Sequence, residues 1–126
     1  GGIIGGPEAP ALYVSGGEAA SVAALFPGLE THVVRDASAV KMAFAAWTKG
    51  TAALLLAIRE TASHYGVEDD WRRAAPELEE RLERAEASAR AKGWRWAGEM
   101  DEIADTFAAA GQPDGFHRAA AEVYRR

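Results

Sequence analysis

The stretch Ser38-Ala-Val-Lys41-Met-Ala-Phe-Ala-Ala-Trp47 decides the fold, because it opens the longest helical pattern in the chain. The pattern runs on through the apolar segment Leu54-Leu-Leu-Ala-Ile58, and alanine and leucine are strong helix formers. Asp36 or Ser38 can supply the N-cap oxygen, and Gly66 stands where a left-handed C-cap belongs. We therefore expect one long helix over residues 38–65.

Lys41 is the residue of this helix that most needs an explanation, since the stretch around it is almost wholly apolar. An unpaired ammonium that leaves water must extend its stem to the surface, find a carboxylate, or take part in chemistry. The helix dipole disfavours the charged amine near a helix N-terminus, which suits proton transfer to and from an alcohol oxygen. Periodicity alone leaves both the solvent-reaching lysine and the proton-transfer group open.

Length and composition exclude several classes of protein. The 126 residues suffice for a single core, and the net charge of -5 argues against binding of nucleic acid or anionic lipid. No cysteine is present, and the three histidines are scattered, so we expect neither a disulfide framework nor a metal site. The longest apolar run is shorter than the roughly 20 residues that span a bilayer, and no signal peptide is evident. We expect a cytoplasmic protein.

The first 36 residues differ in composition from the rest. They are rich in glycine and proline and contain two β-prone runs, residues 11–15 and 31–35. A short helical segment, residues 19–26, lies between these runs and ends at Pro27-Gly28. The pattern predicts strand, short helix, strand.

Alanine, leucine, arginine and glutamate dominate after residue 37, which predicts a mainly α fold. Beyond the long helix we expect helices over residues 69–91, 94–110 and 116–124. Opposite charges recur at helical spacings in the first of these, as on a solvated face. Gly50 lies within the long helix at a cost of about 1 kcal/mol relative to alanine, which predicts the close approach of another backbone.

Two further patterns offer candidate chemistry. The loop Ile4-Gly5-Gly6-Pro7 could bring backbone amides to an anionic substrate group or could form a plain turn, but it lacks the spacing of a dinucleotide fingerprint and a preceding strand. In residues 92–100, one of two tryptophans should be core and the other surface, while Arg95 could bind a substrate anion or pair with Glu99. His64 and His117 have no partners arranged as a triad and are expected to be structural or exposed.

The whole chain resembles the C-terminal region of the 6-phosphogluconate dehydrogenase and β-hydroxyacid dehydrogenase superfamily, above all NAD(P)-binding proteins with a 6-phosphogluconate-dehydrogenase-like helical C-terminal domain. No single motif is decisive, but the order and spacing of the matching segments are specific. These segments are Gly2-Ile-Ile-Gly-Gly-Pro7, Ser38 through Gly50, Leu54 through Glu60, Lys92 through Ala104, and Gly115 through Tyr124.

The resemblance implies a substrate-binding and dimerisation domain of an NAD(P)-dependent oxidoreductase. In that family a long interdomain helix carries a lysine general acid/base, which the resemblance places at Lys41, and a glycine loop contacts substrate, here Gly5 and Gly6. Thr48 and Trp47 are weaker candidates for the pocket. NAD or NADP would be bound mainly by a Rossmann-type domain that precedes this chain.

The same resemblance implies that residues 1–36 are the tail end of that Rossmann-type domain and that residues 37–126 form the helical domain. We expect a homodimer that acts on a small-molecule substrate. Ile4 stands where the family has a serine, and Ala45 where it has an asparagine, so the usual substrate hydrogen bonds are missing. No counterpart of a downstream cofactor-facing lysine occurs near residues 99–101. The alternative is a non-catalytic helical interaction or oligomerisation module.

Overall fold

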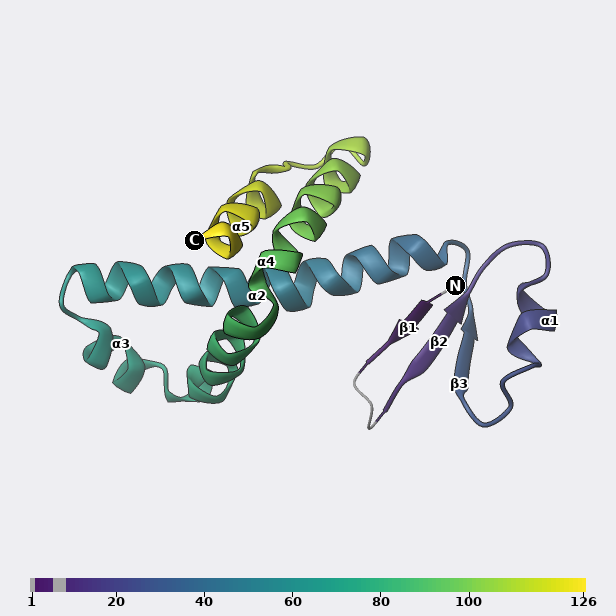
Figure 1. The fold of residues 1–126 in the computed structure, drawn as a ribbon, viewed down its shortest axis with the longest axis horizontal. Helices are drawn as coiled ribbons and strands as arrows, with labels where there is room; N and C mark the ends of the chain where they lie inside the picture. The colour runs from purple at the N-terminus through teal and green to yellow at the C-terminus, as the bar shows by residue number, and fades with distance from the viewer. Residues whose placement is uncertain (1, 6–8) are drawn as a thin grey trace. The chain divides into compact units, whose positions relative to one another are not determined.

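The computed structural model describes residues 2–5 and 9–126 (Figure 1). The chain forms two compact units, Gly1–Ala45 and Ala46–Arg126. The first unit holds a small sheet and the start of a long helix, and the second is wholly helical in its regular structure. The mainly α fold expected from the sequence is confirmed.

The sheet of the first unit has three strands in the order β1-β2-β3 (Figure 1). Strand β1 (Gly2–Ile4) runs antiparallel to β2 (Ala11–Val14), and β2 runs parallel to β3 (Glu30–Val33). Helix α1 (Ala19–Ala23) connects the two parallel strands, which confirms the predicted strand, short helix, strand. The expectation that no strand precedes the glycine loop was wrong, because β1 has three residues and is too short to show a period of two.

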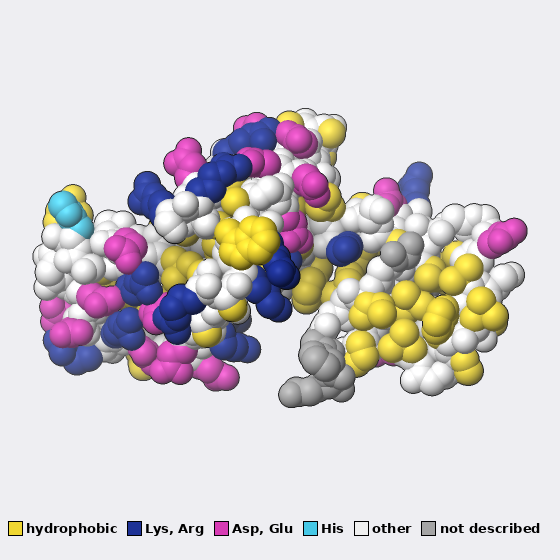
Figure 2. Space-filling view, in the orientation of Figure 1, with side chains coloured by type: hydrophobic (Ala, Val, Ile, Leu, Met, Phe, Trp, Pro, Cys, Tyr) yellow, Lys and Arg dark blue, Asp and Glu magenta, His cyan; other side chains and the backbone are white. Residues whose placement is uncertain are grey.

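Apolar side chains gather on one face of this sheet. Ile3 pairs with Leu12 and Val14 pairs with Val33, so these four residues lie on the same face. Val14 is buried, whereas Ile3 and Val33 are each 59% exposed. Figure 2 shows the hydrophobic side chains collected over the strands.

Helix α2 (Ala37–His64) matches the predicted long helix to within one residue at each end. The Oδ1 atom of Asp36 accepts a hydrogen bond from the backbone N–H of Ala39 at 3.0 Å, which is an N-cap interaction. At the other end Gly66 adopts a φ of +72°, and the Val67 N–H donates to the Ala62 carbonyl at 2.9 Å. This is the left-handed C-cap expected at Gly66.

The prediction of two separate helices over residues 69–91 and 94–110 was wrong. The chain instead forms helix α3 (Glu68–Ala74), a single 3-10 turn η1 (Pro76–Leu78) and one long helix α4 (Glu79–Ala109). Proline can begin but not continue a helix, so the break falls at Pro76. Gly93 does not break α4, because it is buried where a Cβ would lie 3.6 Å from the Tyr124 ring.

Helix α5 (Gly115–Arg125) lies beside α4 and completes the core of the helical unit (Figure 1). Helix α4 ends at Ala109 and is followed by Gly111, whose φ is +76°. No helix within the described residues is long and apolar enough to cross a membrane. The core of the helical unit is formed by buried apolar residues of α2, α4 and α5, namely Ala53, Leu56, Ala62, Leu82, Ala85, Ala97, Met100, Ile103, Ala104, Ala120, Ala121 and Tyr124.

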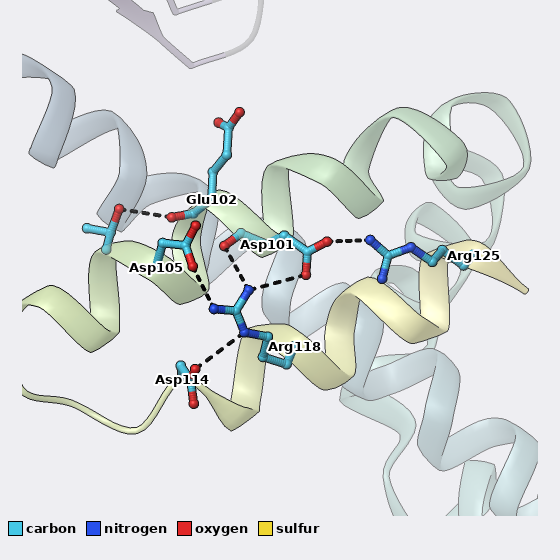
Figure 3. Close-up of polar contacts among 7 residues, drawn as sticks. Asp101, Glu102, Asp105, Asp114, Arg118 and Arg125 are labelled. Carbon is cyan, nitrogen blue, oxygen red and sulfur yellow. Dashed lines mark hydrogen bonds and ion pairs between the residues drawn. The ribbon is translucent and has the colours of Figure 1, made fainter.

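Charged side chains also hold α5 against α4 (Figure 3). The Arg118 guanidinium lies between three carboxylates, at 2.6 Å from Asp105, 3.3 Å from Asp114 and 3.6 Å from Asp101. Arg125 also pairs with Asp101. The hydrogen bond from Arg125 is the main reason that the pKa of Asp101 lies below its ordinary value, with the charges of Arg125 and Arg118 adding to the effect against partial desolvation.

Candidate functional site

Lys41 lies in the second turn of α2, and its side chain is exposed. A Cβ built on Gly2 would lie 3.5 Å from Cδ of Lys41, so the lysine stem runs beside the backbone of β1. Within residues 2–5 and 9–126, Lys41 makes no ion pair. The ammonium is therefore not desolvated as the apolar sequence around it suggested, and the conformation is that of a lysine with a packed stem and a free head.

The described part of the glycine loop follows β1 directly. Gly5 has a φ of +104°, and a Cβ at this position would lie 2.6 Å from the carbonyl oxygen of Ala9. Both facts require glycine, because an L side chain would be strained and would collide with backbone. Gly6 lies outside the described residues. Gly5 and Lys41 thus belong to the same compact unit, with Lys41 against the strand that leads into Gly5.

A second set of polar groups lies inside the helical unit. Lys49 pairs with Glu99 at 2.6 Å, and its ammonium lies 5.1 Å from the ring centre of Trp96. Trp96 in turn makes an edge-on contact with Tyr124, whose hydroxyl donates to the Lys49 carbonyl at 2.5 Å. Burial raises the pKa of Tyr124 to about 12; the backbone N–H of Ala53 opposes that rise, and the charge of Glu99 adds to it.

This cluster was not found from the sequence. The expected pairing of Arg95 with Glu99 was wrong, because Glu99 binds Lys49 from α2 while Arg95 lies over the ring of Trp94 at 5.0 Å. Trp94 is 72% exposed, as expected of the surface tryptophan, whereas Trp96 is half-buried and not part of the core. Residues 49 and 99 are 50 positions apart, so no local pattern could have joined them.

His117 is the buried polar residue of the helical unit, with 6% of its surface exposed. Its Nε2 atom lies 3.0 Å from the backbone carbonyl of Ala46, and since a carbonyl only accepts, Nε2 carries the proton. A Cβ on Gly50 would lie 2.6 Å from this nitrogen. Gly50 therefore admits the ring of His117, and the prediction that another backbone approaches there was wrong. His117 is a structural histidine, as expected.

An apolar groove of about 780 Å³ lies between α2 and α5 in the helical unit. Three large side chains line it and are mostly exposed: Trp47 at 63%, Leu54 at 60% and Phe116 at 71%. Trp47, a candidate pocket residue, therefore belongs to this groove. Thr48 is exposed on the same helix, and its part in a substrate pocket stays a prediction. Contiguous exposed apolar surface of this kind marks an interaction site.

The described residues contain no group of three histidine, aspartate or glutamate side chains that could hold a metal ion. Nor do they contain a dinucleotide fingerprint, because Gly5 stands between two antiparallel strands and not in a strand-to-helix turn. The residues present thus do not fit NAD(P) by themselves. They define a mainly helical chain with an apolar groove in the helical unit and, in the other unit, an exposed lysine whose stem lies against strand β1.

The comparisons with known proteins agree with this class. The model of the domain of unknown function DUF1932 matches residues 62–126, and the chain belongs to that family. DUF1932 is the C-terminal helical domain found in NAD(P)-binding proteins of the 6-phosphogluconate and β-hydroxyacid dehydrogenase type, which confirms the resemblance seen in the sequence. No curated protein and no solved structure matches the chain significantly. The chain is thus a domain of a dehydrogenase-like oxidoreductase.

Proposed function

We propose that this chain is the substrate-binding and dimerisation domain of an NAD(P)-dependent oxidoreductase and that Lys41 is its general acid/base. The observation that carries the proposal is the contact between the Lys41 stem and Gly2, in the strand that leads into Gly5. It places the lysine stem against the strand that connects to the glycine turn, and the lysine and the turn are the two elements that the family resemblance assigns to substrate. Family membership over residues 62–126 supports the reaction class.

The chemistry assigned to Lys41 is a proton transfer. When a substrate alcohol is oxidised, the neutral Lys41 amine would accept the hydroxyl proton, and a nicotinamide cofactor would supply the hydride acceptor. In the reverse direction the ammonium returns that proton to the carbonyl oxygen. The exposed head of Lys41 is free to reach a small substrate, while its packed stem limits the positions that Nζ can take.

The nicotinamide cofactor supplies the hydride acceptor, and we propose that a Rossmann-type domain, to which residues 1–36 also belong, holds it. The exposed apolar face of the sheet, with Ile3 and Val33, supports this assignment, because such a face needs a further layer to cover it. The polar groups that would orient the substrate differ from those of relatives, since Ala45 is buried and offers no side-chain hydrogen bond.

The test is hydride transfer by Lys41→Met in the protein that carries both the cofactor-binding part and this domain. Lys92→Met is the matched control, because Lys92 is an exposed lysine on α4. We expect turnover to fall by about a hundredfold or more in Lys41→Met, as for loss of a general acid/base, with cofactor binding retained. The control should keep its turnover. Equal turnover in wild type and Lys41→Met would remove Lys41 from the mechanism.

We propose further that the groove between α2 and α5 is covered by a second copy of the chain. Trp47, Leu54 and Phe116 present exposed apolar surface, and a two-fold axis would place this surface of one copy against the same surface of the other. We expect sedimentation at twice the chain mass of 13.4 kDa and a monomer for the Leu54→Glu/Phe116→Glu double variant. Leu25→Glu, at an exposed leucine of the other unit, should stay dimeric. A monomeric wild type would refute this assignment.

The groove would serve a non-catalytic interaction module equally well, and this is the second candidate function. The oxidoreductase domain and the interaction module differ in whether Lys41 takes part in hydride transfer. A dimer that forms normally while Lys41→Met has no effect on hydride transfer would favour the interaction module.

A further inference from the structure

A second pocket, of about 840 Å³, lies where α2, α4 and α5 meet. Its apolar wall includes Leu56, Ala89 and Val123, and the last of these also lines the groove described above. Its polar wall is cationic in composition, with three arginines and a histidine. The polar side chains are Arg59, Arg90, Arg126, His64, Thr61, Tyr65, Glu60 and Glu86.

The two carboxylates of this pocket are already neutralised. The Arg59 guanidinium lies 2.7 Å from Glu60 and 3.0 Å from Glu86. Glu86 receives a second arginine, Arg72, at 3.4 Å. Hydrogen bonds and charges from both carboxylates raise the pKa of Arg59, although burial, the largest single effect, opposes them. The charge of these carboxylates is therefore taken up by neighbours within the helical unit.

Arg90 and Arg126, which also line this pocket, differ from Arg59 in their ion pairing. Over residues 2–5 and 9–126, neither side chain makes an ion pair with a carboxylate. The side chains of Arg90 and Arg126 are exposed, and both residues line this pocket, which also has an apolar wall.

We propose that this pocket binds a small organic anion, a phosphate or carboxylate attached to an apolar group. Arg90 and Arg126 hold the anionic group, because guanidinium groups match the geometry of phosphate and carboxylate oxygens. Leu56 and Val123 contact the apolar part. The site belongs to the helical unit and is made of residues other than Lys41 and Gly5, so it goes beyond the proposed oxidoreductase function.

The experiment is calorimetric titration of the chain itself, without nicotinamide, at low ionic strength. The probes are phenyl phosphate, benzoate and inorganic phosphate. We expect saturable one-to-one binding of an aromatic anion, and tighter binding of phenyl phosphate than of inorganic phosphate because of the apolar wall. Whichever of phenyl phosphate and benzoate binds more tightly identifies the anionic group that the site prefers.

Arg90→Gln and Arg126→Gln should each weaken that binding by about tenfold, which corresponds to one charge-assisted hydrogen bond. Arg84→Gln is the matched control, since Arg84 is exposed on the same helix as Arg90 and does not line the pocket. Circular dichroism checks that the wild type and the three variants have equal helicity. Absence of saturable binding, or an equal loss in Arg84→Gln, would overturn the proposal. Neither result would affect the assignment of Lys41, because no hydride transfer is measured.

Discussion

The Nε2 atom of His117 lies 2.6 Å from the position that a Cβ on Gly50 would occupy. The ring cannot easily withdraw, because His117 is buried and hydrogen-bonded to the Ala46 carbonyl at 3.0 Å. Glycine at position 50 costs about 1 kcal/mol of helix propensity relative to alanine, but it leaves the space in α2 that the His117 ring of α5 occupies.

The first prediction concerns Gly50→Ala. The added methyl should clash with the fixed ring and lower the free energy of unfolding by about 1–3 kcal/mol, despite the better helix propensity of alanine. Gly98→Ala on α4 is the control, because no atom lies within 4 Å of its new Cβ, and we expect a gain of up to about 1 kcal/mol there. Urea denaturation measures both. A Gly50→Ala variant as stable as Gly98→Ala would contradict the observed position of His117.

The second prediction concerns Tyr124 at alkaline pH. The pKa of Tyr124 is raised from 10.0 to about 12 in the folded state. Between these two pH values the hydroxyl ionises in the unfolded chain but stays protonated in the folded chain. The contribution of Tyr124 to stability is therefore full below pH 10 and is lost as the pH rises toward 12. In Tyr124→Phe this loss between pH 10 and 12 should disappear. Denaturation midpoints at pH 8 and pH 11 measure the difference.

At neutral pH the same variant loses the hydrogen bond to the Lys49 carbonyl, and we expect a cost of about 1 kcal/mol. Tyr65→Phe is a suitable control, since Tyr65 is 73% exposed. If Tyr124→Phe retained the full alkaline loss of the wild type, another group would be responsible for it.

The third prediction concerns Asp101 and acid. Its folded-state pKa lies below the ordinary value of 3.8, so the stabilisation from Arg125 and Arg118 is full above that value and is lost as the pH falls through the folded-state pKa. Asp101→Asn should therefore be less stable than wild type at pH 7, and the two should converge in strong acid. Urea midpoints across this range are the measurement.

The control for Asp101 is its neighbour Glu102, whose side chain points away from Arg118 in Figure 3. Glu102→Gln should leave the neutral-pH midpoint close to that of wild type. A constant gap between Asp101→Asn and wild type from pH 7 down to strong acid would show that charge on Asp101 does not hold α5 to α4.

Local signals in the sequence were sufficient for some elements and not for others. The long helix α2 could be predicted because its ends at Asp36 and Gly66 are formed by hydrogen bonds between residues at most five positions apart. The predicted break between residues 91 and 94 was wrong, because α4 continues through Gly93, which lies against Tyr124, 31 positions away in sequence. Propensity yields to tertiary contact in such a case.

The candidate site divides in the same way. Lys41 stands out in the sequence by its apolar neighbours, but its contact with Gly2 joins residues 39 positions apart and could not be read from periodicity. The pair of Lys49 and Glu99 joins α2 to α4 and left no local signal either. The role of Lys41 is inferred from the family resemblance, whereas the residues that contact its side chain are known from the structure.

The most direct test of that role is chemical rescue of Lys41→Ala with small primary amines, in the protein that carries the cofactor-binding part together with this domain. We expect hydride transfer to be nearly lost in the variant and to be restored by methylamine and ethylamine, in proportion to the concentration of free amine. Lys92→Ala should show neither loss nor restoration. Undiminished hydride transfer in Lys41→Ala without added amine would contradict the assignment of Lys41 as the proton-transfer group.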